Sequence, residues 1–290
     1  MFSGSYVAIV TPMRADMSVD FDAWLRLIDW HATSGTRGIV VGGTTGESPT
    51  LLDHELRDLV IRARDAARGR LHIIAGAGTS STANTVERAR WLSDLGIDGL
   101  LVVTPAYNKP TQDGLFMHYK AVAEASQIPV LAYNVPARTA VDLLPPTVAR
   151  LARLPGLVGV KEAVADMDRI RELSTICGPR FAVLSGDDAT GREAMSKGAV
   201  GIISVTANVA PLWMSEMVAA ALAGDSRRAE ELDARLAALH RELFVEANPI
   251  PVKWVMHQMG LIGEEIRLPL TLLASRFHDR VREAMHGAGL

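Results

Sequence analysis

The stretch Leu157-Val158-Gly159-Val160-Lys161-Glu162-Ala163 begins as a run of apolar and small residues and reaches an amine near its end. Such a run, directly after Pro155-Gly156, is typical of a parallel strand that is buried on both faces. Lys161 then lies at the carboxyl end of this strand. The chain contains five lysines and twenty-five arginines, so arginine is its ordinary surface cation. A lysine at a strand end therefore needs its own explanation.

The chemistry of the amine suggests one. Arginine keeps its proton in proteins, whereas lysine can lose its proton when it is desolvated. A neutral amine can attack a carbonyl carbon and form a Schiff base. A plainer interpretation is also open at this point, in which Lys161 only pairs with Glu162 or closes the strand.

Composition excludes several classes of protein. With 290 residues and 48% hydrophobic content, the chain can form one large domain, or one domain with an appendage. A net charge of -3 gives no electrostatic footprint for nucleic acid or an anionic membrane. Cys177 is the only cysteine, which predicts a reducing compartment. We expect no signal peptide and no membrane span, and hence a cytoplasmic protein.

The pattern around the opening stretch repeats along the chain. Short runs typical of strands alternate with amphipathic helical segments such as 53–67 and 82–95, at intervals of about 25–35 residues, the length of a βαβ unit. This alternation predicts a (β/α)8 TIM barrel, rather than an open doubly wound sheet, because the first turn, Thr11-Pro12-Met13, is not rich in glycine. The expected strands are 7–12, 38–43, 71–76, 99–105, 129–134, 157–162, 181–186 and 199–205.

The strand pattern stops at about residue 211. Prolines then separate four predicted helices. We expect residues 1–224 to form the catalytic barrel and residues 225–290 to form a C-terminal helical extension packed on it. The four predicted helices are 213–223, 226–244, 251–260 and 270–286.

Barrels of this kind carry their chemistry at the carboxyl ends of the strands. The second strand is followed by Gly42-Gly43-Thr44-Thr45-Gly46-Glu47-Ser48, whose hydroxyls could relay protons or bind a carboxylate. A plain turn with a helix cap is the alternative, and the stretch is not a P-loop because no Gly-Lys-Ser/Thr follows. Tyr107 and Tyr133 follow or end the fourth and fifth strands, where a phenol can act as acid or base.

Two further strand ends are open to different interpretations. Arg138 could hold a carboxylate with its guanidinium fork, or it could be a surface residue. Asp187-Asp188 could suggest a metal, but no histidine has ligand spacing such as His-Glu-x-x-His. We therefore expect no metal site, and expect the acidic pair to face a helix N-terminus.

Taken together, these motifs resemble the dihydrodipicolinate synthase and N-acetylneuraminate lyase family, over nearly the whole chain. The residues from Tyr133 to Thr139 and from Ile203 to Asn208 resemble its synthase branch, although Ala137 and Ala140 replace the usual Ser and Gly. The four motifs that carry the resemblance are Gly43-Thr44-Thr45-Gly46-Glu47, Tyr133-Asn134-Val135-Pro136, Gly159-Val160-Lys161-Glu162 and Ser185-Gly186-Asp187-Asp188.

The resemblance implies a class I aldolase type of reaction without a separate cofactor. Lys161 would form a Schiff base with pyruvate, and the resulting enamine would attack L-aspartate 4-semialdehyde to give 4-hydroxy-tetrahydrodipicolinate, the first committed step toward diaminopimelate and lysine. Tyr133, with Thr45 or Thr44 and Tyr107, would relay protons. The residues expected to bind the two substrates are Thr45, Ile203 and Gly186 for pyruvate and Arg138 for the semialdehyde.

The resemblance also implies an assembly and a regulatory property. Tyr107 would reach the site of a neighbouring subunit, in a homotetramer built as a dimer of dimers. The family's lysine-sensitive members hold lysine with groups that are absent here, so we expect weak or no inhibition by lysine. The residues at the corresponding positions are Leu56, Ser80, Asn84 and Ala106.

Two rival functions are considered. Another branch of the family, acting on a 2-keto-3-deoxy sugar acid or sialic acid, would share Lys161 and Tyr133, but Arg138 and Ala207-Asn208 argue against it. A non-catalytic barrel is disfavoured because the complete set of reactive residues is present.

Overall fold

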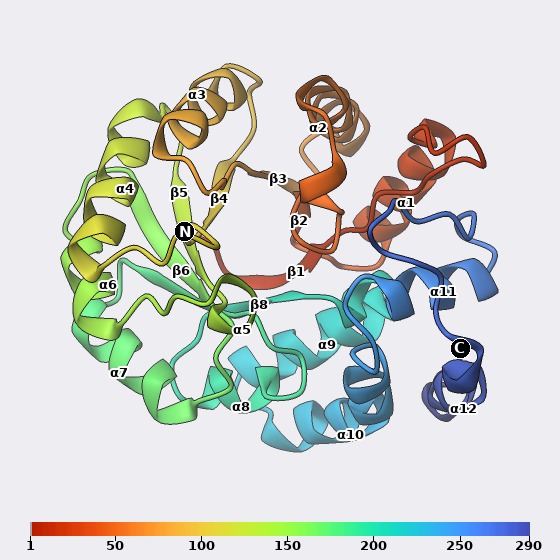
Figure 1. The fold of residues 1–290 in the computed structure, drawn as a ribbon. Helices are drawn as coiled ribbons and strands as arrows, with labels where there is room; N and C mark the ends of the chain where they lie inside the picture. Colours follow the sequence, from red (N-terminus) through yellow and green to blue (C-terminus); the bar gives the residue numbers. More distant parts are fainter. Residues whose placement is uncertain (1) are drawn as a thin grey trace.

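The computed structural model describes residues 2–290, and eight parallel strands form a closed barrel in sequential order (Figure 1). This confirms the predicted (β/α)8 fold. Each strand hydrogen-bonds to its sequence neighbours, and β8 closes the ring on β1 through the pairs Gly4↔Gly201 and Val7↔Ser204. The strands are β1 Gly4–Ala8, β2 Gly38–Val41, β3 His72–Gly76, β4 Gly99–Val103, β5 Val130–Asn134, β6 Leu157–Glu162, β7 Ala182–Ser185 and β8 Gly201–Ser204.

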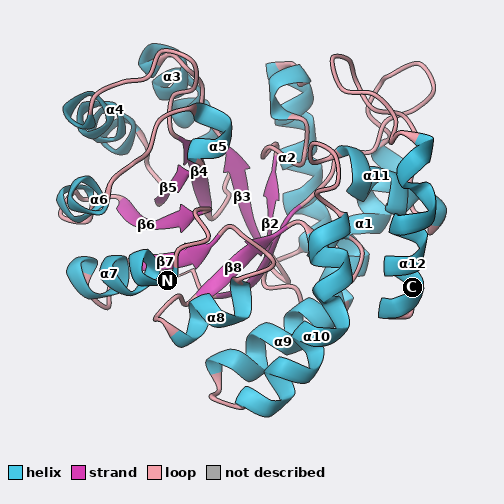
Figure 2. Cartoon of the chain, turned by 60° about the horizontal axis from the view of Figure 1, so that its bottom comes forward, coloured by secondary structure: helices cyan, strands magenta, loops and turns pink. Residues whose placement is uncertain are grey.

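Helices surround the strands on the outside of the barrel (Figures 1 and 2). Within the described part, none is long and apolar enough to span a bilayer. The α-helices are α1 Phe21–Thr33, α2 Asp53–Ala67, α3 Thr82–Ser93, α4 Gln112–Ala125, α5 Pro136–Thr139, α6 Pro145–Leu151, α7 Met167–Cys177, α8 Gly191–Ser196, α9 Pro211–Leu222, α10 Ser226–Glu242, α11 Ile250–Gln258 and α12 His278–Ala288. Three 3-10 turns lie at η1 Ser48–Thr50, η2 Thr206–Asn208 and η3 Ser275–Phe277.

Side chains alternate between the two faces of each strand, and this alternation produces two apolar clusters. The larger cluster fills the space between the sheet and the helices. The smaller one fills the barrel lumen and includes Tyr6, Leu131, Tyr133 and Ile203. The lumen is therefore filled with mainly apolar side chains, and the cavity lies above them at the carboxyl ends of the strands.

The predicted first strand, 7–12, is misplaced toward the C-terminus. β1 begins at Gly4 because both neighbours supply hydrogen bonds there: Gly4 N donates to Val200 O, and Ser5 O accepts from Arg37 N. Ile9 N donates once more to Val40 O in β2, but Val10 N already bonds the Asn208 side chain, and Pro12 has no N–H to offer to a strand ladder. The other seven predicted strands lie within two residues of the observed ones.

The predicted helix 270–286 is wrong in its first part, since α12 begins only at His278 after the turn η3. The preceding chain is held by tertiary contacts instead. The Arg267 guanidinium bonds the carboxylate of Glu55 and the backbone oxygens of Met17 and Thr50. These bonds fix the chain before residue 270 against the barrel loops. Within the predicted helix itself, the Ala274 backbone N–H donates to the Glu246 carboxylate and not to a helical carbonyl.

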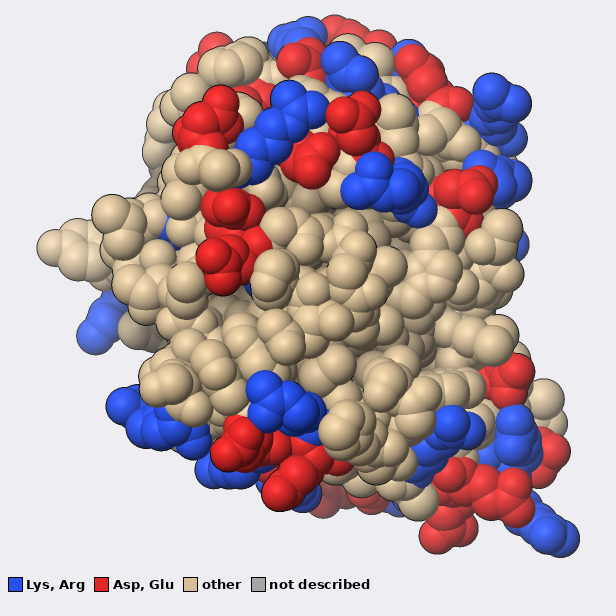
Figure 3. All heavy atoms as spheres, turned by 90° about the vertical axis from the view of Figure 1, so that its right-hand side faces the viewer, with Lys and Arg blue, Asp and Glu red and all other residues tan. Residues whose placement is uncertain are grey.

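The last three helices lie together along one side of the molecule, with α10 packed against α9 and α12 (Figure 1). On the face seen from that side, acidic and basic side chains are interspersed above and below a broad uncharged band (Figure 3). Neither sign of charge dominates this face, in keeping with the small net charge of -3.

Candidate active site

Lys161 lies in β6 and is 5% exposed, with its side chain at the carboxyl end of the barrel lumen. Its amine stands over the Tyr133 ring, 4.4 Å from the ring centroid. Among residues 2–290, no group forms a hydrogen bond or ion pair with Nζ of Lys161. Gly186 provides the room for this side chain, because a Cβ at Gly186 would lie 2.8 Å from Cε of Lys161.

The register between β5 and β6 explains why the side chains of Tyr133 and Lys161 lie next to each other. Tyr133 is paired with Lys161, and Asn134 with Glu162. Since neighbouring pairs point to opposite faces, the first pair enters the lumen and the second faces the helices. The alternative in which Lys161 pairs with Glu162 is therefore wrong, because their side chains lie on opposite faces of the same strand.

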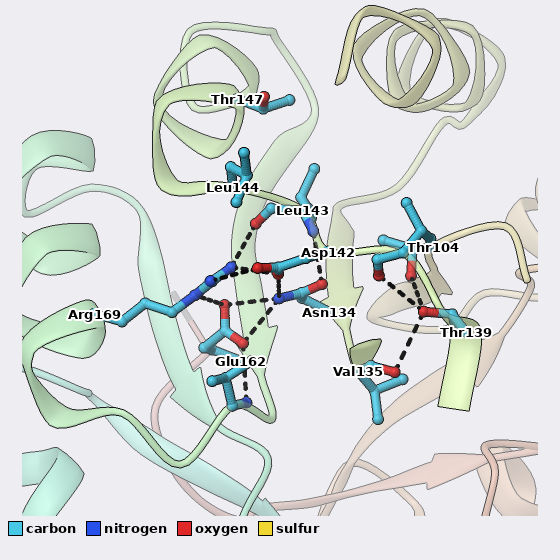
Figure 4. A network of polar contacts seen from close by, with 12 residues as sticks. Thr104, Asn134, Val135, Thr139, Asp142, Leu143, Leu144, Thr147, Glu162 and Arg169 are labelled. Atoms are coloured by element: carbon cyan, nitrogen blue, oxygen red, sulfur yellow. Dashed lines mark hydrogen bonds and ion pairs between the residues drawn. The ribbon is translucent and has the colours of Figure 1, made fainter. Parts of the chain in front are cut away.

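On the outer face, Glu162 belongs to a buried polar network (Figure 4). Its carboxylate accepts hydrogen bonds from Arg169 Nε at 2.9 Å and from Asn134 Nδ2 at 3.0 Å. The Arg169 guanidinium also bonds Asp142 and the Leu143 carbonyl. Burial raises the pKa of the Glu162 carboxyl, and the Arg169 guanidinium opposes this shift. The network joins β5 and β6 to the segment that follows α5, and so fixes the elements that carry Tyr133, Lys161 and Arg138.

A cavity of about 400 Å³ opens above Lys161. It receives groups from β2, β5, β6 and β7, and also from the segment between α10 and α11. The predicted site residues that line it are Thr44, Thr45, Tyr133, Arg138, Lys161 and Gly186. The structure therefore brings most of the predicted site together around one amine that lines the cavity.

Two predicted site residues do not line this cavity. Ile203 lies in the buried lumen cluster. Tyr107 follows β4 in a backbone conformation with φ 74 and is 94% exposed. A tyrosine that is almost fully exposed in its own chain cannot relay protons at that chain's Lys161 without a large movement.

Asn248 lines the same cavity and was missed by sequence reasoning. Its side-chain amide donates to Thr45 Oγ1 at 3.0 Å, and its backbone oxygen accepts from Arg138 Nη2 at 3.2 Å. The only signal in the sequence is the stretch Ala247-Asn248-Pro249, which interrupts a helical region. This stretch predicts a turn, but it does not indicate which residues the turn contacts.

A second buried lysine lies in α11. Lys253 is 2% exposed on its side chain, and its Nζ pairs with the Glu47 carboxylate and donates to Thr11 O at 3.0 Å. The other carboxylate oxygen of Glu47 accepts from the Arg267 backbone N–H. Glu47 adopts the left-handed conformation, with φ 59, two residues after Thr45. The C-terminal segment thus clamps the loop that follows β2.

The acidic pair after β7 makes local contacts. Asp187 Oδ1 accepts from the Thr190 backbone N–H and hydroxyl, and Asp188 Oδ2 accepts from Val205 N and Thr206 N. Within residues 2–290, no group of three or more His, Cys, Asp or Glu side chains is arranged to hold a metal. Asp188 instead ties the end of β8 to the end of β7.

The model of the dihydrodipicolinate synthetase family matches residues 1–288. The chain belongs to this family. A 4-hydroxy-tetrahydrodipicolinate synthase of Thioalkalivibrio sulfidiphilus is 52% identical over 290 residues, covering 100% of this chain and 99% of that protein. Another, from Methylococcus capsulatus, is 50% identical, with complete coverage of both chains. Relatives this similar, over their full length, place the chain in the synthase branch.

Solved structures of dihydrodipicolinate synthetase family members agree with this assignment. A chloride-inhibited dihydrodipicolinate synthase from Acinetobacter baumannii, complexed with pyruvate, has a TM-score of 0.98 and 49% identity, covering 100% of this chain and 99% of that one. A monomeric dihydrodipicolinate synthase variant has a TM-score of 0.97 and 40% identity, covering 100% and 97%. The chain is an enzyme of the lyase class, and the branches that act on sugar acids are not favoured.

Proposed function

We propose that the chain condenses pyruvate with L-aspartate 4-semialdehyde to give 4-hydroxy-tetrahydrodipicolinate. The observation that carries the proposal is Lys161, a buried amine that lines a cavity and pairs with no carboxylate of residues 2–290. Such an amine is not held in an ion pair and lines the cavity, so it is placed to bond the ketone carbon of a substrate there. The A. baumannii enzyme complexed with pyruvate, 49% identical, supports the choice of the first substrate.

The reaction begins at Nζ of Lys161. The amine adds to the ketone carbon of pyruvate, water leaves, and an imine forms. The imine withdraws electrons, so the methyl group loses a proton and becomes the nucleophilic carbon of an enamine. That carbon attacks the aldehyde of the semialdehyde, and its oxygen takes up a proton. The amino group of the second substrate then displaces the lysine from the imine carbon, which closes the ring and restores Lys161. The protein's own amine therefore supplies the electron sink, and the reaction needs no separate cofactor.

These steps require protons to be moved to and from the reacting atoms. Tyr133, whose ring lies against the Lys161 amine, is the proposed acid and base. Thr44 or Thr45 extends the relay, and both line the cavity. Thr45 together with the strand end at Ile203 and Gly186 is proposed to hold pyruvate, and Arg138 to hold the carboxylate of the semialdehyde with its planar fork.

Tyr107 enters the proposal through a second copy of the chain. Its 94% exposure leaves it free to reach a neighbouring subunit, so we infer a dimer in which each chain completes the other's relay, within a tetramer formed by two dimers. The cytoplasm is the proposed compartment, as expected for a chain with one cysteine.

Trapping with borohydride tests the central step. Incubation with pyruvate and borohydride is expected to add one reduced pyruvyl group, located on Lys161 by peptide mass spectrometry. A panel of the semialdehyde, 2-keto-3-deoxy sugar acids and sialic acid then identifies the second substrate. A label on another residue, or turnover of a sugar acid in place of the semialdehyde, would overturn the proposal.

Mixing two inactive variants tests the role of Tyr107. Hybrid dimers of Lys161→Ala and Tyr107→Phe chains contain one site with both groups intact, so mixing is expected to restore activity. The control is each variant mixed with itself under the same exchange conditions. Activity no greater than the sum of the two variants, after mass spectrometry has proved subunit exchange, would assign Tyr107 to its own chain.

A further inference from the structure

The turn between α10 and α11 places one amide against the pocket that holds Lys161. Asn248 is 6% exposed, and its side chain makes a single hydrogen bond, from Nδ2 to Thr45 Oγ1 at 3.0 Å. Its Oδ1 is buried with no partner among the described residues. Burying an unpaired amide oxygen costs free energy, and an apolar side chain of similar shape would avoid this cost. The amide is thus poorly explained by stability alone.

The direction of that hydrogen bond determines what Thr45 can do. An amide nitrogen only donates, so the Thr45 oxygen must accept from Asn248. A hydroxyl has one hydrogen to donate, and with a lone pair committed to Asn248 the O–H of Thr45 is left to donate to another group. Among the described residues, no other side-chain hydrogen bond is formed by the Thr45 hydroxyl.

Other contacts hold the backbone of the Thr45 loop. Glu47 is bound by Lys253 and by the Arg267 N–H, and the Gly46 carbonyl accepts from Thr11 Oγ1 at 2.7 Å. The Asn248 amide is therefore not needed to keep the loop in place. Its one hydrogen bond to the loop goes to the hydroxyl of Thr45.

We propose that Asn248 is a positioning residue that orients the Thr45 O–H toward the carboxylate of pyruvate. A carboxylate accepts hydrogen bonds and cannot donate them, so it complements a hydroxyl whose acceptor side is occupied. The inference rests on the proposed function and deepens it. It assigns Thr45 to binding of the first substrate and leaves Thr44 for the proton relay.

The backbone of Asn248 provides an internal control. Its carbonyl oxygen accepts from Arg138, the proposed ligand of the second substrate. Changing the side chain leaves this carbonyl in place. A side-chain variant should therefore affect pyruvate and spare the semialdehyde, whereas a distortion of the whole turn would affect both.

Steady-state kinetics of Asn248→Leu and Asn248→Ala test the proposal. The first variant keeps most of the side-chain volume, and the second removes it. Both are expected to raise the KM for pyruvate about tenfold, the usual effect of losing one well-oriented hydrogen bond to a charged group. The kcat and the KM for the semialdehyde should stay unchanged. The lost hydrogen bond stabilises the bound ground state and the transition state equally, so its loss weakens only the binding of pyruvate. Asn248→Leu should keep the melting temperature.

A double-mutant cycle with Thr45→Val shows whether Asn248 acts through Thr45. In the Thr45→Val background, Asn248→Leu is expected to add nothing to the KM for pyruvate. The inference would be overturned if the effects of the two substitutions on the KM for pyruvate multiplied. It would also be overturned by an equal rise in both KM values, or by an unchanged KM for pyruvate in both Asn248 variants. Failure of the proposed function is a separate result, since the unmodified chain would then not trap pyruvate at Lys161.

Discussion

Two lysines of this chain are almost completely buried, and they differ in what faces the amine. Lys253 meets the Glu47 carboxylate and the Thr11 carbonyl. Lys161 meets the face of the Tyr133 ring and an open cavity. Burial lowers the pKa of the Lys253 amine, and the Glu47 carboxylate opposes that shift. The comparison teaches that burial alone does not make a reactive amine: it must also lack a carboxylate and have space for a ligand.

The largest expected effect follows from replacing Lys161. Lys161→Met should reduce turnover by at least about a thousandfold, because no other group in the cavity can form the imine. Its free energy of unfolding should not fall, since a buried amine without a partner is exchanged for an apolar chain of similar length. Initial rates and urea denaturation measure both. Lys120→Met, on the surface of α4, is the control and should match the unmodified chain. A clear loss of stability in Lys161→Met would contradict the comparison.

Replacing Lys253 should have the opposite effects, a loss of stability without a loss of the reactive amine. Lys253→Met leaves the Glu47 carboxylate buried and unpaired, which typically costs about 3–5 kcal/mol in the free energy of unfolding. Chains that remain folded should still trap pyruvate at Lys161. Urea denaturation and trapping at low temperature measure these two properties.

The double variant Lys253→Met, Glu47→Gln removes both charges and is expected to regain most of the lost stability, because no uncompensated charge remains. If Lys253→Met were stable but unable to trap pyruvate, Lys253 would belong to the reaction and the contrast between the two lysines would fail.

A smaller effect is expected at Arg138, which lines the cavity and bonds the Asn248 carbonyl. Arg138→Ala should weaken use of the semialdehyde by roughly 1.5–3 kcal/mol, the range for a hydrogen bond to a charged group. Pyruvate trapping should be spared. The ratio of kcat/KM between variant and parent gives the first quantity, and borohydride labelling gives the second. Equal damage to both steps would indicate that Arg138 supports the fold of the cavity.

The smallest expected effect concerns inhibition by free lysine. Its ammonium groups would need a carboxylate partner, as Lys253 has in Glu47. A second cavity of about 440 Å³ lies beside Thr44, and its charged lining residues are Arg88 and Arg138, with Ser80 and Ala106 also present. A cationic ligand without a carboxylate partner keeps its desolvation cost. Lysine should therefore inhibit weakly or not at all. Half-inhibition below about 1 mM, a binding free energy near 4 kcal/mol, would contradict this.

One relative gives that titration a positive control. A dihydrodipicolinate synthase from Cyanidioschyzon merolae has been solved with lysine bound, and it is 35% identical to this chain with a TM-score of 0.96. When lysine binding to the two proteins is measured side by side, a failed measurement can be separated from a true lack of binding by this chain.

The sequence was sufficient for the barrel because its signals are local. Apolar runs alternating with amphipathic helices identify the strands, and the ends of parallel strands must meet at one rim. Lys161 and Tyr133 could therefore be placed together before any coordinates were known. The rarity of lysine draws attention to Lys161, but it applies equally to Lys253 and does not distinguish the roles of the two residues.

The contacts between distant segments could not be predicted. Lys253 lies 206 residues from Glu47, and Asn248 lies 203 residues from Thr45. Helical periodicity in the extension indicates which face is apolar, but not which turn rests on which loop of the barrel. The early part of the predicted helix 270–286 failed for the same reason, because the Ala274 backbone N–H bonds Glu246, a residue of another segment.

The clamp on the loop after β2 has a consequence for the order of synthesis. The ribosome synthesises the chain from the N-terminus to the C-terminus, so all eight strands are made before Asn248, Lys253 and Arg267. Until then Glu47 has neither of these two partners from the C-terminal segment, and Thr45 lacks the amide that bonds its hydroxyl. The pocket described above is therefore complete only after the last fifth of the chain has been synthesised.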